Sequence, residues 1–219
     1  MSRLLVIFLF LLGNAVAADE PFIVSYPPHY EIEPCKKIVQ RAYADLGITV
    51  EFVELPVERR LFSLSKGLTD ADVGARQRQF EQYENIDAVP LSLTTVYLYL
   101  LCHSKDCSPQ VLKNERLKVH STHFGLGMLK TLFGDDVKAQ ITTIENYRTL
   151  IDMFHLRRAE SIVYVTGKDL TQWQQEHTAS VALLHETPLY HVVNHRHAAL
   201  IRPLTRALRK HLMASQRIE

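Results

Sequence analysis

Two arginines occupy positions that suit the binding of an anion. Arg76 follows the third predicted strand, and Arg59 begins the second predicted helix. A guanidinium binds a carboxylate through two parallel charge-assisted hydrogen bonds, and a helix start adds backbone N–H groups that favour an anion. We therefore expect Arg76, assisted by Arg59, to contact an anionic ligand. The alternatives are that both are solvated, that Arg78 replaces Arg76, and that Arg60 faces solvent or pairs with Glu58.

Aromatic and hydroxyl side chains are expected near the same site. Tyr26 and Tyr30 bracket a stiff Pro-Pro pair after the first predicted strand, where an aromatic wall would suit an apolar or cationic ligand group. Packing in the core is an equal alternative for these rings. Thr122 and His123 precede Gly125 at a strand-to-helix turn, which is a suitable place for a carboxylate.

Histidine is frequent, with 11 in the chain, and His191, His195 and His197 lie close together in the sequence with His185 nearby. Three imidazoles could bind zinc, nickel or copper. However, His195 and His197 would point well apart around a helix, and no acidic residue flanks them closely. We therefore expect a structural or solvated cluster and no metal site.

Sequence motifs of common hydrolases and nucleotide-binding enzymes do not occur: Gly-x-Ser-x-Gly, His-Glu-x-x-His and the phosphate loop are all missing. An enzymatic function would depend on Glu160 or His123 as a general base or acid in a cleft. We expect a protein that is not an enzyme and that needs no cofactor.

The N-terminus has the order of a secretory signal peptide. Arg3 precedes nine apolar residues at 4–12, and small residues follow at 15–18. As a helix, nine residues reach only ~14 Å at ~1.5 Å each, which is short of the ~30 Å core of a bilayer. We expect residues 1–18 to be removed near Ala17 or Ala18 and the mature chain to be periplasmic.

The mature chain is balanced in charge. Loss of the leader removes Arg3 and leaves 24 basic and 24 acidic residues. Because proteins that bind nucleic acid usually carry a basic surplus, we expect no nucleic-acid partner.

Three cysteines are expected to differ in state. Cys102 and Cys107 flank a short His-Ser-Lys-Asp turn, and an oxidising compartment favours a local disulfide between them. Cys35 lies on the apolar face of a predicted helix and is expected to be a buried free thiol. Three free thiols are the open alternative.

The pattern of apolar residues predicts alternating strands and helices. In the first part, strands are expected at residues 21–26, 49–55, 71–75 and 88–91, with one helix from Pro34 to Gly47 and another that buries Val57, Leu61, Leu64 and Leu68. This βαβαβ order predicts a parallel sheet with helices on both faces.

A second, similar unit follows the cysteine turn. Strands are expected at residues 117–121, 137–142, 161–165 and 181–184, with helices starting near Gly125, after a capping box of Thr142 and Glu145, and around residues 170–176. A terminal helix repeats Leu200, Leu204, Leu208 and Leu212, with a kink or a late start at Pro203.

Several short segments, in this order and spacing, resemble bacterial extracellular solute-binding proteins of family 3. They are Tyr26-Pro27-Pro28, Leu46-Gly47-Ile48, Pro56-Val57-Glu58-Arg59, Gly67-Leu68-Thr69-Asp70-Ala71-Asp72, Arg76, and Arg158-Ala159-Glu160-Ser161-Ile162-Val163. The resemblance covers most of residues 21–213. It implies an α/β, two-lobed type II periplasmic binding protein fold, with each lobe a central sheet flanked by helices.

The resemblance also implies a division into lobes. Lobe one would span residues 19–95 and lobe two residues 96–189, while residues 190–219 would return and pack at lobe one. Residues 96–102 and 189–194 would be the crossing segments, and a ligand would lie in the cleft between the lobes.

Family members hold a ligand carboxylate with an arginine near the position of Arg76, and Thr122, His123 and Thr166 would contribute from lobe two. Amino-acid binders usually place an aspartate after the later strand of lobe two, but residues 164–167 are Tyr-Val-Thr-Gly and the next acid is Asp169. An α-amino acid would lack its usual counter-ion here, which favours a plain carboxylate, an amine-free metabolite or no small ligand at all, although an amino-acid-like ligand stays open beside an organic acid.

The resemblance implies a monomer that delivers a small polar, carboxylate-bearing metabolite to an inner-membrane ABC permease or a sensor. Two alternatives stay open. One is an orphan relative that contacts a protein partner, and the other is a periplasmic dehydratase of small acids on the same fold.

Overall fold

The chain forms one mixed sheet with helices on both faces, in a computed structural model that describes residues 21–170 and 179–215. The expected leader and most of the helix expected at 170–176 lie outside the described residues. The strands are β1 (Phe22–Tyr26), β2 (Val50–Glu54), β3 (Ala71–Arg76), β4 (Ile86–Cys102), β5 (Lys118–Ser121), β6 (Gln140–Thr143), β7 (Ser161–Thr166) and β8 (Ser180–Asn194). The helices are α1 (Glu33–Ala44), α2 (Val57–Ser65), α3 (Gln77–Phe80), α4 (His123–Phe133), α5 (Tyr147–His155) and α7 (Ile201–Ser215).

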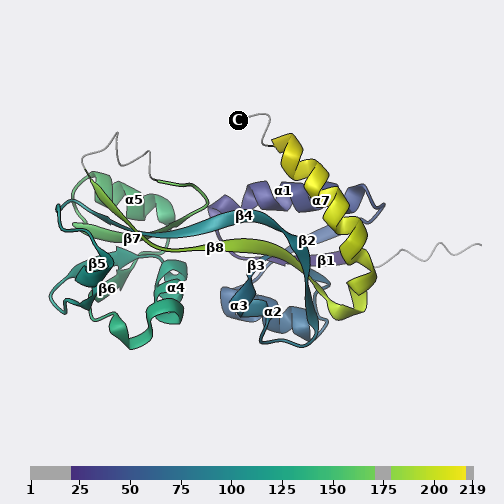
Figure 1. Cartoon of the computed structure of the whole chain (residues 1–219), viewed down its shortest axis with the longest axis horizontal. Helices are drawn as coiled ribbons and strands as arrows, with labels where there is room; N and C mark the ends of the chain where they lie inside the picture. Colours follow the sequence, from purple (N-terminus) through teal and green to yellow (C-terminus); the bar gives the residue numbers. More distant parts are fainter. Residues whose placement is uncertain (1–20, 171–178, 216–219) are drawn as a thin grey trace, which may run out of the picture.

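The strand order β2-β1-β3-β8-β4-β7-β5-β6 divides the sheet into two parallel groups joined by a long antiparallel ribbon. β1 pairs in parallel with β2 and β3, and β5 pairs in parallel with β6 and β7. Between them, β4 and β8 pair antiparallel from Ile86 opposite Asn194 to Cys102 opposite Ser180. These two strands run through both halves of the molecule (Figure 1).

This ribbon corrects the prediction of a parallel sheet. The strand expected at 88–91 and the crossing segment expected at 96–102 are both parts of β4. The strand expected at 181–184 and the crossing segment expected at 189–194 are both parts of β8. Polar residues around Ser92 and Thr94 interrupt the apolar pattern, and the pairing with β8 shifts register there. The chain nevertheless stays extended, because β-branched threonines fit a half-buried strand. Since β4 and β8 are continuous across both halves, the division at residues 95/96 and 189/190 stays a prediction.

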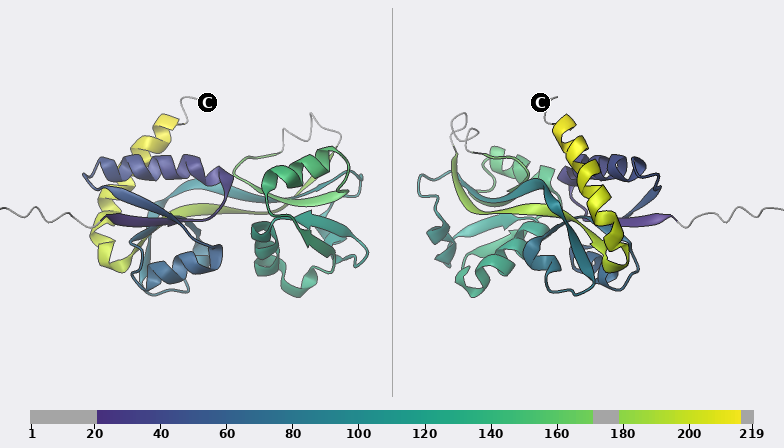
Figure 2. Two further views of the ribbon diagram at one scale, coloured as in Figure 1. Left: turned by 180° about the vertical axis from the view of Figure 1, so that it is seen from behind. Right: turned by 45° about the vertical axis from the view of Figure 1, so that its right-hand side comes forward.

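Each half has its own core. In the first half, α1 and α7 cover one face of the sheet and α2 and α3 the other; in the second, α5 and α4 take the two faces (Figures 1 and 2). The core of the first half includes Val24, Tyr43 and Leu204, and that of the second includes Leu98 and Leu129. Separate buried clusters in the two halves, joined by two strands, make an arrangement suited to hinge motion.

Helix boundaries follow local chemistry, with two corrections. As expected, Gly47 takes a left-handed φ of 72° beyond α1, and α7 starts late so that Pro203 lies in its first turn. Leu68 is wrong as a core residue, because α2 ends at Ser65 and leaves that side chain 66% exposed. The N-cap of α5 is Asn146, not Thr142, and its side chain accepts a hydrogen bond from Thr149 N at 2.8 Å.

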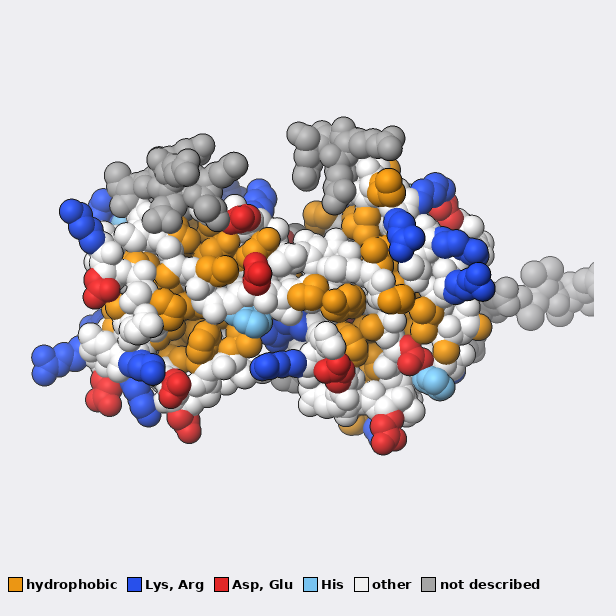
Figure 3. All heavy atoms as spheres, viewed as in Figure 1, with side chains coloured by type: hydrophobic (Ala, Val, Ile, Leu, Met, Phe, Trp, Pro, Cys, Tyr) orange, Lys and Arg blue, Asp and Glu red, His pale blue; other side chains and the backbone are white. Residues whose placement is uncertain are grey.

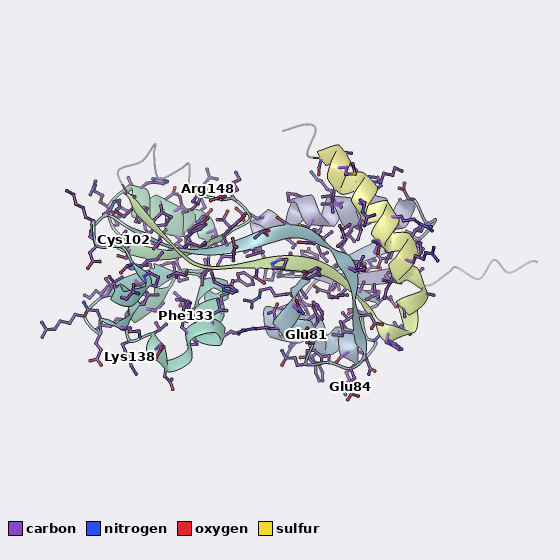
Figure 4. The ribbon with its side chains drawn as sticks, in the orientation of Figure 1. Glu81, Glu84, Cys102, Phe133, Lys138 and Arg148 are labelled. Carbon is purple, nitrogen blue, oxygen red and sulfur yellow. A yellow bond between two sulfur atoms is a disulfide. The ribbon has the colours of Figure 1, made fainter. Side chains whose placement is uncertain are left out.

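The cysteines adopt the expected states. Cys102, at the far end of β4 (Figure 4), and Cys107 form a disulfide with their Cα atoms 5.7 Å apart, and Cys35 is a buried free thiol. Among the described residues, no helix is long and apolar enough to span a bilayer. Basic and acidic side chains are interspersed on the face shown in Figure 3.

Candidate ligand-binding site

A cleft of about 610 Å³ lies between the two halves. Its first wall comes from the loop after β1, from α2, and from the end of β3 with α3; its second comes from α4 and the turn before α5. The lining residues are Pro27, Pro28, Pro56, Leu61, Arg76, Gln79, Gln82, Tyr83, Thr122, His123, Phe124, Gly127, Met128, Thr131, Glu145, Asn146 and Tyr147. This volume is in the range of small-molecule sites, and apolar walls with a few polar groups are typical of them.

Arg76 is the cation of this cleft. It is the last residue of β3, and its side chain is partly buried. It forms no salt bridge with any described residue. Burial lowers the pKa of its guanidinium, and the charge of Arg60 lowers this pKa further. A partly desolvated cation beside a like charge is stabilised by an anion that enters the cleft.

Arg60 forms a buried salt bridge with Asp72, the acid on the same strand as Arg76. Its side chain is buried and contacts Asp72 Oδ1, and it donates a second hydrogen bond to Gly74 O at 3.2 Å. Asp72 also accepts from Ser25 Oγ at 2.7 Å and from Gly74 N at 3.0 Å. We expected Arg60 to face solvent or to pair with Glu58. That expectation is wrong, because Arg60 is buried and pairs with Asp72. The signal was present in the sequence, because a single acid inside an apolar strand requires a buried partner.

The second wall is built at the start of α4. Thr122 is the N-cap of this helix, and its buried Oγ1 accepts a hydrogen bond from Gly125 N at 3.1 Å. A Cβ at Gly125 would lie 2.3 Å from Ser121 Oγ, so glycine lets the helix approach β5 closely. Exposed His123 and partly buried Phe124 follow along the cleft. The wall thus combines a helix N-terminus with an aromatic ring.

The sequence matches no protein-family model, and it matches no curated protein. Solved structures do match over most of their length. The ligand-binding core of GluR0 in complex with L-glutamate has a TM-score of 0.65 at 12% identity, covering 90% of this chain and 94% of that one. An ancestral amino-acid-binding protein, described as a precursor of cyclohexadienyl dehydratase, has a TM-score of 0.63 at 16% identity, with 87% and 88% covered. The chain has the two-lobed fold of type II periplasmic binding proteins.

A third structure supports the same fold. AbpA from Streptococcus pneumoniae, an amino-acid ABC transporter substrate-binding protein bound to L-arginine, has a TM-score of 0.62 at 12% identity, with 89% of this chain and 90% of that one covered. We name the half that contains β1 to β3 lobe one and the half that contains β5 to β7 lobe two; β4 and β8 run through both.

The structure brings three of the candidate residues together in the cleft, namely Arg76, Thr122 and His123, and places three others elsewhere. Arg59 is exposed and does not line the cleft. The ring of Tyr26 packs within lobe one. Its centroid lies 3.9 Å from Lys36 Nζ and 6.3 Å from the centroid of the Phe52 ring.

Thr166 contacts the protein itself. Its Oγ1 donates a hydrogen bond to Glu31 Oε1 at 2.9 Å, so that it joins lobe two to lobe one outside the residues that line the cleft. Nothing is described of the side chain of Tyr30. The two other acids discussed above are also outside the cleft lining: Glu160 is exposed before β7, and Asp169 accepts a hydrogen bond from the Tyr99 hydroxyl at 3.1 Å.

Several cleft residues were missed from the sequence. Glu145 and Asn146 line the cleft from the turn before α5, and burial raises the pKa of Tyr147 beside them, which keeps its phenol neutral. Gln79, on α3, lines the opposite wall of the cleft. Since β5 and β6 are parallel, the turns after both strands meet at one edge of the sheet, and this rule could have located Glu145 and Asn146.

The clustered histidines point to separate partners. Buried His191 shares a hydrogen bond with Tyr43 Oη (Nε2 to Oη 2.9 Å), His195 pairs with Asp87 at 2.7 Å, and His197 with Asp70 at 2.7 Å. Within residues 21–170 and 179–215, no group of three metal-ligating side chains is positioned to hold an ion.

Proposed function

We propose that this chain is a periplasmic solute-binding protein that captures a small carboxylate-bearing metabolite between its lobes. The observation that carries the proposal is the partly buried guanidinium of Arg76, which lines the cleft and forms no salt bridge with a described residue. The fold supports the proposal, because ligands of two-lobed α/β proteins bind at the carboxyl ends of the strands, where this cleft lies.

The charge arrangement favours an anion. The charge of Arg60 lowers the pKa of Arg76, whereas Asp72 is engaged by Arg60, Ser25 and Gly74. The pKa of His185 on β8 is lowered by burial and then by the charges of Arg76 and Arg78, while Glu186 acts in the opposite direction, so Arg76 acts on its surroundings as a cation. A bidentate carboxylate on Arg76 would neutralise the surplus charge.

The remaining walls indicate the shape of the ligand. The N-terminus of α4, capped by Thr122, faces the cleft and favours the same anionic end. Phe124 and Met128 offer apolar contact to a carbon chain or ring. Glu145, at the turn before α5, could accept a donor group of the ligand, which supplies an acid that residues 164–167 lack.

The proposal also covers localisation and partners. We infer a periplasmic monomer whose signal peptide is cleaved near Ala17 or Ala18. It would bind an inner-membrane ABC permease or a sensor protein and would need no cofactor. The comparisons support the binding role through the fold alone, since the matched structures include amino-acid-binding proteins for transporters.

Release of the natural ligand tests this function. Protein purified under native conditions would be denatured, and the released small molecules would be measured by mass spectrometry, with the Arg76→Gln variant as the comparison. We expect an organic acid that is enriched in the wild-type protein and lost from the variant. Equal amounts of every small acid from both proteins would contradict the proposal, and a product formed from an added acid would indicate a dehydratase instead.

A further inference from the structure

One short turn of lobe one makes direct contact with lobe two. It consists of His29 and the 3₁₀ turn Tyr30–Ile32, which lie between β1 and α1. His29 is the N-cap of this turn, and its Nδ1 accepts a hydrogen bond from Glu31 N at 3.2 Å. The cap holds the His29 ring against the backbone of Glu31, so both residues are placed by the same turn.

The Glu31 carboxylate binds the end of β7. Thr166 Oγ1 donates to Oε1 at 2.9 Å, and Gly167 N donates to Oε2 at 2.6 Å. Thr166 Oγ1 in turn accepts from Lys168 N at 3.1 Å, so its proton is directed to Glu31. Hydrogen bonds to a carboxylate are about twice as strong as neutral ones, and Thr166 is only 1% exposed, so its hydroxyl is shielded from water.

The His29 ring contacts the other part of lobe two. Its centroid lies 4.5 Å from that of Tyr147 on α5 and 5.4 Å from that of Phe124 on α4. Burial lowers the pKa of His29, while Glu31 acts in the opposite direction. A neutral ring therefore packs on the same aromatic side chains that line the cleft.

We propose that the turn formed by His29 and Glu31 is a clasp that holds the two lobes together before a ligand arrives. Glu31 does not line the cleft, so it is a positioning residue that acts through closure. The inference rests on the proposed function, because the closed population sets the affinity of a two-lobed binding protein for its ligand.

The clasp is tested on mature protein from which bound ligand has been stripped by unfolding and refolding, so that no knowledge of the ligand is needed. Glu31→Gln keeps the size of the side chain but can satisfy only one of the two donors, and Thr166→Val removes the hydroxyl while keeping the shape. The matched control is Glu33→Gln, because Glu33 pairs with Lys36 within α1, with Nζ to Oε1 at 2.7 Å.

Two measurements report on the clasp directly. We expect both clasp variants, but not Glu33→Gln, to have a larger radius of gyration by small-angle X-ray scattering. The Gly167 amide should exchange with solvent about tenfold faster in Glu31→Gln than in the wild type, since a hydrogen bond to a charged group is lost.

Unchanged scattering and unchanged exchange in Glu31→Gln would overturn the clasp, and so would a wild-type Gly167 amide that exchanges as fast as an unprotected one. Because these measurements use ligand-free protein, a failed clasp leaves the carboxylate site untouched, and a failed carboxylate site leaves the clasp intact.

Discussion

At the scale of single residues, the division of labour between two arginines explains the site. Arg60 is buried and neutralised by Asp72, whose remaining acceptor positions are taken by Ser25 and Gly74 N. Arg76 lies at the end of the same strand, in the cleft, without a salt bridge to a described residue. One arginine therefore serves the fold, and the other is available to a ligand.

This difference predicts unequal effects on stability. Arg60→Met leaves Asp72 buried without its cation and should lower the free energy of unfolding by about 3 kcal/mol. Arg76→Met removes a partly desolvated charge beside a like charge and should stay within about 1 kcal/mol of the wild type. Urea denaturation of the ligand-free proteins measures both, and equal losses in the two variants would contradict the assignment.

Buried His191 predicts a pH dependence of stability. Burial lowers its pKa to about 4, below the ordinary value of about 6.5, so the unfolded chain takes up the proton first as pH falls. The contribution is complete above pH 6.5 and is lost between about pH 6.5 and 4, with about 2 kcal/mol gone at pH 5.

Urea denaturation at pH 7 and pH 5 would show this loss of stability in the wild type. The loss should be smaller in His191→Gln. His155→Gln, at an exposed position on α5, is the control and should keep the wild-type dependence. The same pH dependence in His191→Gln as in the wild type would show that another group is responsible.

At the scale of elements, the long antiparallel ribbon of β4 and β8 separates and joins the two lobes. Each strand belongs to both lobes, and the pairing shifts register between Ala88 and Thr94 and again between Leu98 and Tyr99. The disulfide between Cys102 and Cys107 closes the turn at the lobe-two end of β4. The disulfide restrains the unfolded chain at the point where the ribbon ends.

Reduction of this disulfide should lower stability by about 2 kcal/mol, as the closure of a loop of about six residues predicts. A thermal melt with and without reductant measures the loss in the wild type. The double variant Cys102→Ala and Cys107→Ala should melt at one temperature in both conditions. A response to reductant in that variant would indicate that Cys35 pairs with another chain.

The sequence predicts elements well where one periodicity holds and poorly where chemistry is shared between distant segments. The apolar spacing of Cys35, Val39 and Ala42 locates α1 and its buried face. By contrast, local spacing cannot show that β4 is continuous, because the strand is held by its partner β8. The resemblance led to Arg76 and Thr122. The sequence did not show that Arg59 is exposed and Arg60 is buried, because the burial of Arg60 depends on Asp72, a tertiary partner.

At the scale of the whole molecule, the two lobes enclose a cleft lined by Arg76, which forms no salt bridge with a described residue, by the N-terminus of α4 and by aromatic side chains. Each lobe has its own core, so that the lobes can move as units about β4 and β8. The side chain of Glu31, on a turn of lobe one, accepts hydrogen bonds from lobe two. Ligand binding and lobe closure are therefore expected to be coupled in this molecule.

The central claim, that Arg76 anchors a carboxylate between the lobes, is tested most directly by a thermal-shift screen of ligand-stripped residues 19–219. The panel would contain amino acids, organic acids, polyamines and divalent metals, and Arg76→Gln and the exposed neighbour Arg78→Gln would be screened in parallel. A ligand at about 100 times its dissociation constant adds about 2.7 kcal/mol to the stability of the folded protein. We predict that carboxylates raise the melting temperature of the wild type and of Arg78→Gln by several degrees, but not that of Arg76→Gln. No shift with any carboxylate, or an equal shift in Arg76→Gln, would contradict the account.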